Sequence, residues 1–252
     1  VIYPMTLATG AKGNLYVGEA NSNNILEITK DQKAKIVIEG EIAKNELSYP
    51  SGLEIGSNQE IYFSDQYNNR ILINAGDSFR ALIDNKSKYD VEDVPNPMNP
   101  TSLRIGPDGA VYVLFDKDGS VYKIAKRQIS TVLNPNKIQG IDDFAINSKG
   151  EIFILSTENK KVYKIINENE IATIAGLNPP KGGKTVYSTR KNISSSRHLA
   201  KKQYEPAIMD NFPAVKIPFG HPVSIDIDLN DNLYVADDKF GTIRKIDNDG
   251  II

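Results

Sequence analysis

The feature that most constrains the fold of this 252-residue chain is a pattern that recurs five times. Its centre is an aromatic residue inside a short run of mostly aliphatic residues, found at Tyr16, Tyr62, Tyr112, Phe153 and Tyr234. Twelve residues earlier stand Pro4, Pro50, Pro100, Ile141 and Pro222, and nine residues later stand Ile25, Ile71, Val121, Val162 and Ile243. Five occurrences with both offsets kept indicate an internal repeat.

Each repeat unit has the pattern of a small antiparallel sheet. An alternating run such as GLEI or SIDI follows the proline, a turn rich in Gly, Asn and Asp comes next, and the aromatic strand follows. A polar gap then leads to a third run such as VYKI or IRKI, and four of the five units close with a fourth run. Period-2 runs separated by turn residues predict hairpin-linked strands. The sequence therefore predicts an all-β protein, a β-propeller of four-stranded blades in which the aromatics pack between blades.

The repeats resemble the NHL-repeat family of propellers. The resemblance rests on the proline before the first strand, the YV or YF of the second and a third strand that mixes apolar with basic residues, and it is clearest in HPVSIDIDLNDNLYVADDKFGTIRKI at 221–246. The family's Asp three residues after the aromatic is present as Asp65 and Asp237, and Glu19 replaces it in the first unit. The resemblance implies that this Asp bonds to loop backbone within its own blade. It implies little about function, because the family includes sensors, binders and relatives of enzymes.

The number of blades depends on residues 177–220. Successive aromatics are 46, 50, 41 and then 81 residues apart, and a blade takes about 40 residues. The range 177–220 is therefore either a degenerate blade or a long basic inter-blade loop within a single domain, 1–252. We predict six blades with one degenerate, and five blades is the alternative. We also expect the N-terminal VIY to supply the missing strand of the last blade and close the ring.

The composition excludes several classes of site. The chain has no cysteine, which removes disulfides and thiolate sites, and an exported, extracytoplasmic location would suit such a chain. No apolar run is long enough for a membrane helix, so we expect no membrane insertion. The net charge of −2 provides no general attraction to nucleic acid. The oligomeric state is left open by these features.

The loops between second and third strands are the expected binding surface, because loops held by a rigid scaffold tend to carry function. They are polar and differ from blade to blade. We predict a non-catalytic recognition module that binds a protein or glycan partner through this loop face, with contacts from Glu19, Asp65, Arg70, Asp116, Asp237 and Lys239.

A basic stretch offers the first alternative function. Residues 181–202 contain seven basic residues and no acidic one: Lys181, Lys184, Arg190, Lys191, Arg197, Lys201 and Lys202. Together with nearby tyrosines they could bind RNA or another polyanion through charge and stacking. A solvated loop without a partner has the same composition.

Catalytic chemistry has few candidate residues. His198 and His221 are the two histidines, so a three-histidine zinc site is excluded, and there is no G-x-S-x-G motif. These counts favour a protein that is not an enzyme and needs no cofactor. The second alternative is a calcium-dependent hydrolase or lactonase. Its metal candidates would be Glu19, Asp65 and Asp237, since calcium accepts oxygens from scattered loops.

Overall fold

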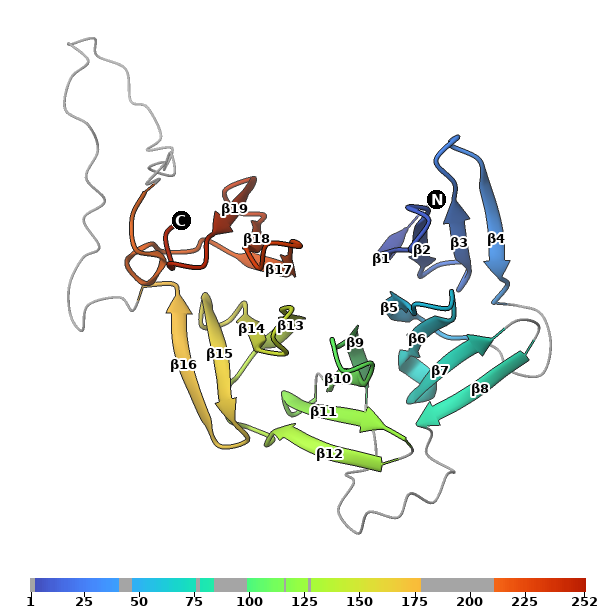
Figure 1. The fold of residues 1–252 in the computed structure, drawn as a ribbon, viewed down its shortest axis with the longest axis horizontal. Coiled ribbons are helices and arrows are strands. Elements are labelled where there is room, and N and C mark those ends of the chain that lie inside the picture. The colour runs from blue at the N-terminus through green and yellow to red at the C-terminus, as the bar shows by residue number, and fades with distance from the viewer. Residues whose placement is uncertain are drawn as a thin grey trace.

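The computed structural model describes residues 3–40, 47–75, 78–83, 99–115, 117–126, 128–177 and 211–252. These residues form five antiparallel sheets that stand side by side in an arc, so the protein is an all-β propeller (Figure 1). Four sheets have four strands and the fifth has three. The strands of each sheet are neighbours in sequence order, which is the meander that the repeat predicts.

Each sheet is one repeat unit, and we call the sheets blades 1 to 5. Blade 1 contains β1 (Pro4–Thr9), β2 (Leu15–Glu19), β3 (Ile25–Ile28) and β4 (Ala34–Ile38). Blade 2 contains β5 (Pro50–Ile55), β6 (Ile61–Asp65), β7 (Arg70–Ala75) and β8 (Ser78–Ile83), with the 3-10 turn η1 (Gln66–Asn68) between β6 and β7. Blade 3 contains β9 (Pro100–Ile105), β10 (Val111–Phe115), β11 (Ser120–Ala125) and β12 (Gln128–Leu133).

Blades 4 and 5 complete the arc. Blade 4 contains β13 (Ile141–Ile146), β14 (Ile152–Ser156), β15 (Lys161–Asn167) and β16 (Glu170–Ala175). The turn η2 (Ala214–Lys216) leads to blade 5, which contains β17 (Pro222–Ile227), β18 (Leu233–Asp237) and β19 (Thr242–Ile246). Within the described residues the helices are single 3-10 turns, and none could cross a bilayer.

The anchors of the sequence repeat fall at equivalent points of the blades. The residue twelve positions before the aromatic begins the first strand in every blade, and the aromatic itself lies in the second strand. Their packing role is confirmed for four units, since Tyr16, Tyr62, Tyr112 and Phe153 pack in the apolar cores between blades. Tyr234 lies outside these cores.

The apolar core is divided among the four interfaces between successive blades. Blades 1 and 2 share a cluster that includes Ile25 and Leu53, and blades 2 and 3 share one around Ile71 and Leu103. Blades 3 and 4 enclose Val121 with Phe144, and blades 4 and 5 enclose Val162 with Ile225. These eight side chains are at most 1% exposed. Because a single sheet cannot bury both of its faces, the repetition itself creates the core.

The prediction of six blades is not confirmed. The described residues form five, which matches the alternative and the five recognised repeats. The range 211–220 contains the turn η2 in place of strands, and residues 178–210 lie outside the described part of the chain.

The expectation that the N-terminal VIY supplies a strand to the last blade is wrong for Tyr3, the one residue of the three that the structure describes. The carbonyl of Tyr3 accepts a hydrogen bond from the backbone N of Ala20 in blade 1 at 3.0 Å. The strand that follows, β1, pairs with β2 of the same blade, because Pro4 begins a complete repeat unit of its own. Val1 and Ile2 lie outside the described residues.

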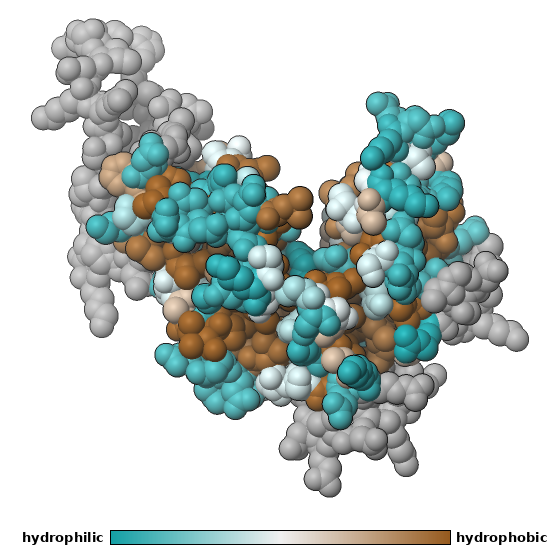
Figure 2. Space-filling view, in the orientation of Figure 1, coloured by the Kyte–Doolittle hydropathy of each residue, from teal (hydrophilic) through white to brown (hydrophobic). Residues whose placement is uncertain are grey.

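The arc is open between blade 1 and blade 5. Figure 1 shows the two end blades facing each other across a gap, and Figure 2 shows the same opening as a notch in the molecular surface. Leu7 occupies in blade 1 the repeat position of Leu53 and Leu103, yet it is 61% exposed. Ile243 occupies in blade 5 the position of Ile25, yet it is 75% exposed. Both side chains are exposed because the described residues place no further blade against them.

Candidate functional site: the axial cavity

The first strands of the blades line the inside of the arc and surround a cavity of about 700 Å³. All five blades contribute to its walls. Its lining includes Leu7, Tyr49, Ser51, Gln66, Ser102, Arg104, Asp142, Asp143, Val223, Ser224 and Asp226. A concave site lined by apolar side chains and a few convergent polar groups is the usual form of a ligand pocket.

The alternation of the first strands explains why charged residues gather at this cavity. In β9 the buried Leu103 points between blades, so its neighbours Ser102 and Arg104 point to the other side of the strand. The same alternation places Asp143 beside the buried Phe144 and Asp226 beside the buried Ile225. Glu54 and Arg104 occupy the equivalent position of blades 2 and 3, and Asp143 reaches Arg104 from a different position of blade 4. Side chains of opposite charge thus meet at the inner strands.

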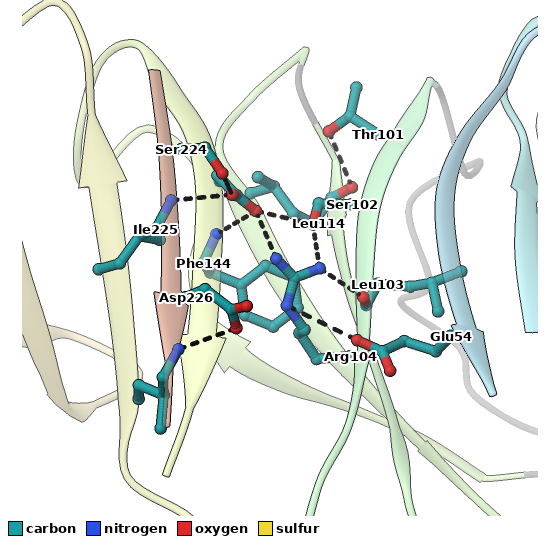
Figure 3. A network of polar contacts seen from close by, with 12 residues as sticks. Glu54, Thr101, Ser102, Leu103, Arg104, Leu114, Phe144, Ser224, Ile225 and Asp226 are labelled. Carbon is teal, nitrogen blue, oxygen red and sulfur yellow. Dashed lines mark hydrogen bonds and ion pairs between the residues drawn. The ribbon is translucent and has the colours of Figure 1, made fainter. Parts of the chain in front are cut away.

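Asp143 and Arg104 form the centre of a polar network on the cavity wall. Figure 3 shows Arg104 and the surrounding side chains of this network. Arg104 Nη2 lies 3.0 Å from Asp143 Oδ1, and the same oxygen accepts hydrogen bonds from Ser102 Oγ at 3.0 Å and from the backbone N of Phe144 at 2.9 Å. The second oxygen, Oδ2, accepts from Ser224 Oγ at 2.9 Å and from the backbone N of Ile225 at 3.1 Å. One carboxylate therefore joins β9, β13 and β17.

Arg104 is held on all sides of its guanidinium. Nη1 donates to the carbonyl of Leu103 at 2.9 Å and to Ser102 Oγ at 3.1 Å, Nε lies 3.7 Å from Glu54 Oε1, and the group stands 5.6 Å from the centroid of the Phe144 ring. Burial alone would lower the pKa of Arg104. The carboxylates of Asp143, Glu54 and Asp226 outweigh burial and raise it, so the side chain is a fixed positive charge.

Glu54 behaves differently from the other carboxylates around Arg104. Burial, opposed by Arg104 and reinforced by the charges of Asp226 and Asp143, raises the pKa of Glu54 to about 7. The site thus holds one permanent positive charge beside three carboxyl groups, one of which takes up a proton near neutral pH. Such a site can donate to and accept from a polar ligand at the same time.

The described residues do not assemble a metal site. Among them, no group of three or more His, Cys, Asp or Glu side chains lies close enough together to hold an ion. The three candidates Glu19, Asp65 and Asp237 belong to blades 1, 2 and 5 and bond within or beside their own loops.

The acidic candidates of the loop face are buried within the blades. Asp237 is 1% exposed and accepts hydrogen bonds from the backbone N of Gly220 at 2.6 Å and of His221 at 2.9 Å. Asp65 is 1% exposed and accepts from the backbone N of Ser48 at 2.6 Å. Glu19 is 7% exposed and accepts from the hydroxyl of Ser22. Asp65 and Asp237 thus bond to loop backbone, as the family resemblance implies.

Some of the other predicted site residues lie in described loops, and the rest lie outside the described residues. Arg70 Nε lies 2.5 Å from Asp65 Oδ2, and Lys239 is exposed in the turn after β18. Asp116 lies outside the described residues. So do all seven basic residues of 181–202, and polyanion binding there stays a prediction that a salt-dependent heparin-binding assay would test.

The residues at the centre of the axial cavity are not among those predicted from the sequence. The cavity reaches Tyr49 and Gln66, which belong to the loops of the predicted face. Glu54 and Asp226 were interpreted only as polar residues of the alternating runs GLEI and SIDI, and Arg104 and Asp143 were not singled out. One signal was available: Glu54 and Arg104 carry opposite charges at the same position of neighbouring repeats, which a solvent-facing strand does not require.

Comparison with known proteins supports the fold. No protein-family model and no curated protein sequence matches the chain. Solved structures do. A virginiamycin B lyase from Staphylococcus aureus, in an inactive form with quinupristin, has 17% identity and a TM-score of 0.62 over 98% of this chain and 68% of its own. A gluconolactonase from Xanthomonas campestris has 12% identity and a TM-score of 0.64 over 99% and 74%.

A third similar structure is a binding protein. A chain of a nidogen/laminin complex has 11% identity and a TM-score of 0.65 over 97% of this chain and 75% of its own. At identities this low the likeness shows the fold alone, and enzymes and binding proteins both occur among these structures. The comparisons therefore establish a β-propeller fold and leave the activity to be argued from the cavity.

Proposed function

We propose that this propeller is a recognition module that binds a polar group of a protein or glycan partner in the axial cavity. The observation that supports it is the cavity itself, where all five blades meet around the Arg104–Asp143 network. The network is held by hydrogen bonds from three blades, so its donors and acceptors are fixed before a ligand arrives. Such preorganisation lowers the entropic cost of binding.

Two features favour binding over catalysis. The one histidine among the described residues, His221, bonds to Asp238 at 2.8 Å outside the cavity lining. Arg104 and Asp143 have their polar atoms committed to each other and to neighbouring groups. Groups held in this way are better suited to orient a ligand at the cavity wall than to transfer protons.

A pair of tryptophan variants tests the site. Val223 lines the cavity and is 37% exposed, so Val223→Trp should fill the cavity without disturbing the core. Val215 is 43% exposed in η2, away from the cavity lining, and Val215→Trp is the matched control. The probes are a panel of neutral oligosaccharides and of short peptides, screened by ligand-detected NMR. We expect at least one probe to bind the native protein and Val215→Trp and to lose binding to Val223→Trp.

Two results would contradict this function. Equal binding of the probes to both tryptophan variants would place their site elsewhere on the molecule. A complete absence of binding across the panel would remove the support for a recognition role of the cavity.

A second candidate is an enzyme that opens a lactone or a related ester. Glu54, with a pKa of about 7, is the observation in its favour, because a carboxyl group that exchanges a proton near neutral pH can serve as an acid or a base. Gluconolactonases occur among the similar structures. Hydrolysis of gluconolactone by the purified protein, with and without added calcium, and its loss in Glu54→Gln would support this function. Inertness under both conditions would exclude it for that substrate.

A further inference from the structure

We propose that Tyr49 and Tyr67 form a stacking platform at the rim of the axial cavity that binds the ring face of a neutral sugar residue, an inference that rests on the proposed function. The two rings are stacked, with centroids 4.8 Å apart and an interplanar angle of 21°. Tyr49 lines the cavity, and Tyr67 is 63% exposed. Two parallel phenol rings, one buried against the other, leave a flat aromatic surface beside a polar cavity.

The repeats provide an internal comparison for this pair. Thirteen residues before the strand aromatic, the five units carry Tyr3, Tyr49, Asn99, Gly140 and His221. Five residues after it they carry Asn21, Tyr67, Lys117, Glu158 and Lys239. Blade 2 alone has a tyrosine at both positions. A structural role common to all blades would favour similar residues at equivalent positions. We therefore infer that Tyr49 and Tyr67 have a role that is specific to blade 2.

The backbone of Tyr49 strengthens this argument. Its φ is 64°, in the left-handed region, where the equivalent Asn99 and Gly140 have φ of 66° and 60°. Asparagine and glycine adopt this conformation at low cost, whereas a bulky side chain there is strained. Strain of this kind persists where the side chain has a function. Tyr49 thus occupies a position whose positive φ disfavours a bulky side chain.

Hydrogen bonds fix the backbone that carries the two rings. The backbone N of Tyr49 donates to Asn23 Oδ1 at 2.9 Å, and the carbonyl of Tyr49 accepts from the backbone N of Gln66 at 3.3 Å. The backbone N of Tyr67 donates to the carbonyl of Ser48 at 3.1 Å. Asp65 secures the same corner, since it accepts from the backbone N of Ser48. The backbone beneath the two stacked rings is therefore held in place before a ligand binds.

The charges around the cavity select the class of ligand. Asp142, Asp143 and Asp226 line it together with the single cation Arg104. This excess of carboxylates disfavours phosphate, and with it a nucleotide whose base would also stack on tyrosine. A sugar ring presents C–H groups on one face, which pack on an aromatic face, and hydroxyls at its edge. Those hydroxyls can donate to or accept from Gln66, Ser51 and the carboxylates.

The test uses three tyrosine variants and neutral oligosaccharides. The probes are maltohexaose, cellohexaose and mannohexaose, titrated into the purified protein by calorimetry. We expect one of them to bind, Tyr67→Ala to weaken its affinity about tenfold, and Tyr67→Phe to keep the affinity within about twofold, because the stacking face is retained. Phe212→Ala, which removes a half-exposed aromatic outside the cavity lining, is the control that should bind normally.

Tyr49→Asn separates a binding role from a structural one. Asparagine relieves the backbone strain, so we expect the Tm to rise by a few degrees while sugar affinity falls. A pair of tyrosines kept for stability would instead lose Tm in both Tyr49→Asn and Tyr67→Ala.

The remaining outcomes separate this proposal from the proposed function. If a sugar binds native protein and Tyr67→Ala equally but fails to bind Val223→Trp, the platform is wrong and the cavity function stands. If no sugar binds, but a peptide binds the native protein and does not bind Val223→Trp, the proposed ligand class is wrong and the cavity function again stands.

Discussion

At the scale of single residues, Asp143 shows how a buried charge is made stable. Its two oxygens receive hydrogen bonds from two hydroxyls and two backbone N–H groups, and Arg104 pairs with one of them. A carboxylate so fully satisfied avoids the penalty of an unpaired buried charge. It also ties three blades together through their inner strands, on the side of each strand opposite the buried Leu103, Phe144 and Ile225. The proposed recognition site therefore shares its atoms with the junction of blades 3, 4 and 5.

Glu54 leads to a prediction about pH. Its pKa of about 7 in the folded protein exceeds the ordinary value of 4.5, so the folded state holds this proton more tightly than the unfolded state does. Its contribution to stability is complete below pH 4.5 and is lost as the pH rises through 7, with an upper limit of about 3 kcal/mol. Glu54→Gln removes this dependence. The free energy of unfolding of the native protein should therefore fall relative to that of the variant when the pH is raised from 5 to 8. Urea denaturation of both proteins at the two pH values measures this change.

The control for Glu54 is an exposed glutamate. Glu168 lies in the turn between β15 and β16, and Glu168→Gln should follow the native protein at both pH values. A Glu54→Gln profile parallel to the native one would show that Glu54 is ionised at pH 5 in the folded state.

At the scale of elements, the strands were predictable because their signals are local and repeated. Pro50, Tyr62 and Ile71 each mark a strand by chemistry that acts within a few residues, and five copies of the pattern average out the exceptions. The bonds from Asp65 and Asp237 to loop backbone were expected from the family resemblance alone. Their partners are backbone N–H groups of the preceding inter-blade loops, and the pattern of residues by itself does not say where those groups point.

The loop entering blade 5 tests this role of the aspartates. Asp237 accepts from two consecutive backbone N–H groups, of Gly220 and His221, while its neighbour Asp238 is exposed. Asp237→Ala leaves buried donors without a partner and should lower the free energy of unfolding by about 3 kcal/mol. Asp238→Ala should lower it by less than about 1 kcal/mol. Similar losses in thermal or urea unfolding would show that the carboxylate of Asp237 does not hold the loop.

At the scale of the whole molecule, the sequence predicted a propeller but not where its charges meet. The repeat fixes the order of strands and which side chains enter the interfaces. The axial network depends instead on the distance between first strands of different blades, which joins Arg104 to Glu54 and to Asp143 across blade boundaries. No local pattern encodes that distance. The blade number was also misjudged, because an 81-residue spacing was taken as two blades.

The open arc makes two equivalent leucines differ in their importance for stability. Leu53 is 1% exposed between blades 1 and 2, and Leu7, at the same repeat position in blade 1, is 61% exposed beside the gap. Leu53→Ala should therefore lower the free energy of unfolding by about 2–5 kcal/mol, and Leu7→Ala by less than about 1 kcal/mol. Urea denaturation of both variants, with sedimentation velocity run in parallel, measures the difference. An equally large loss for Leu7→Ala would mean that something covers the face of blade 1 in solution, and a dimer in the sedimentation profile would identify a second copy as the cover. A small loss in a monomeric protein would mean that the end blades are stabilised from one side only, by the same interfaces that hold the inner three.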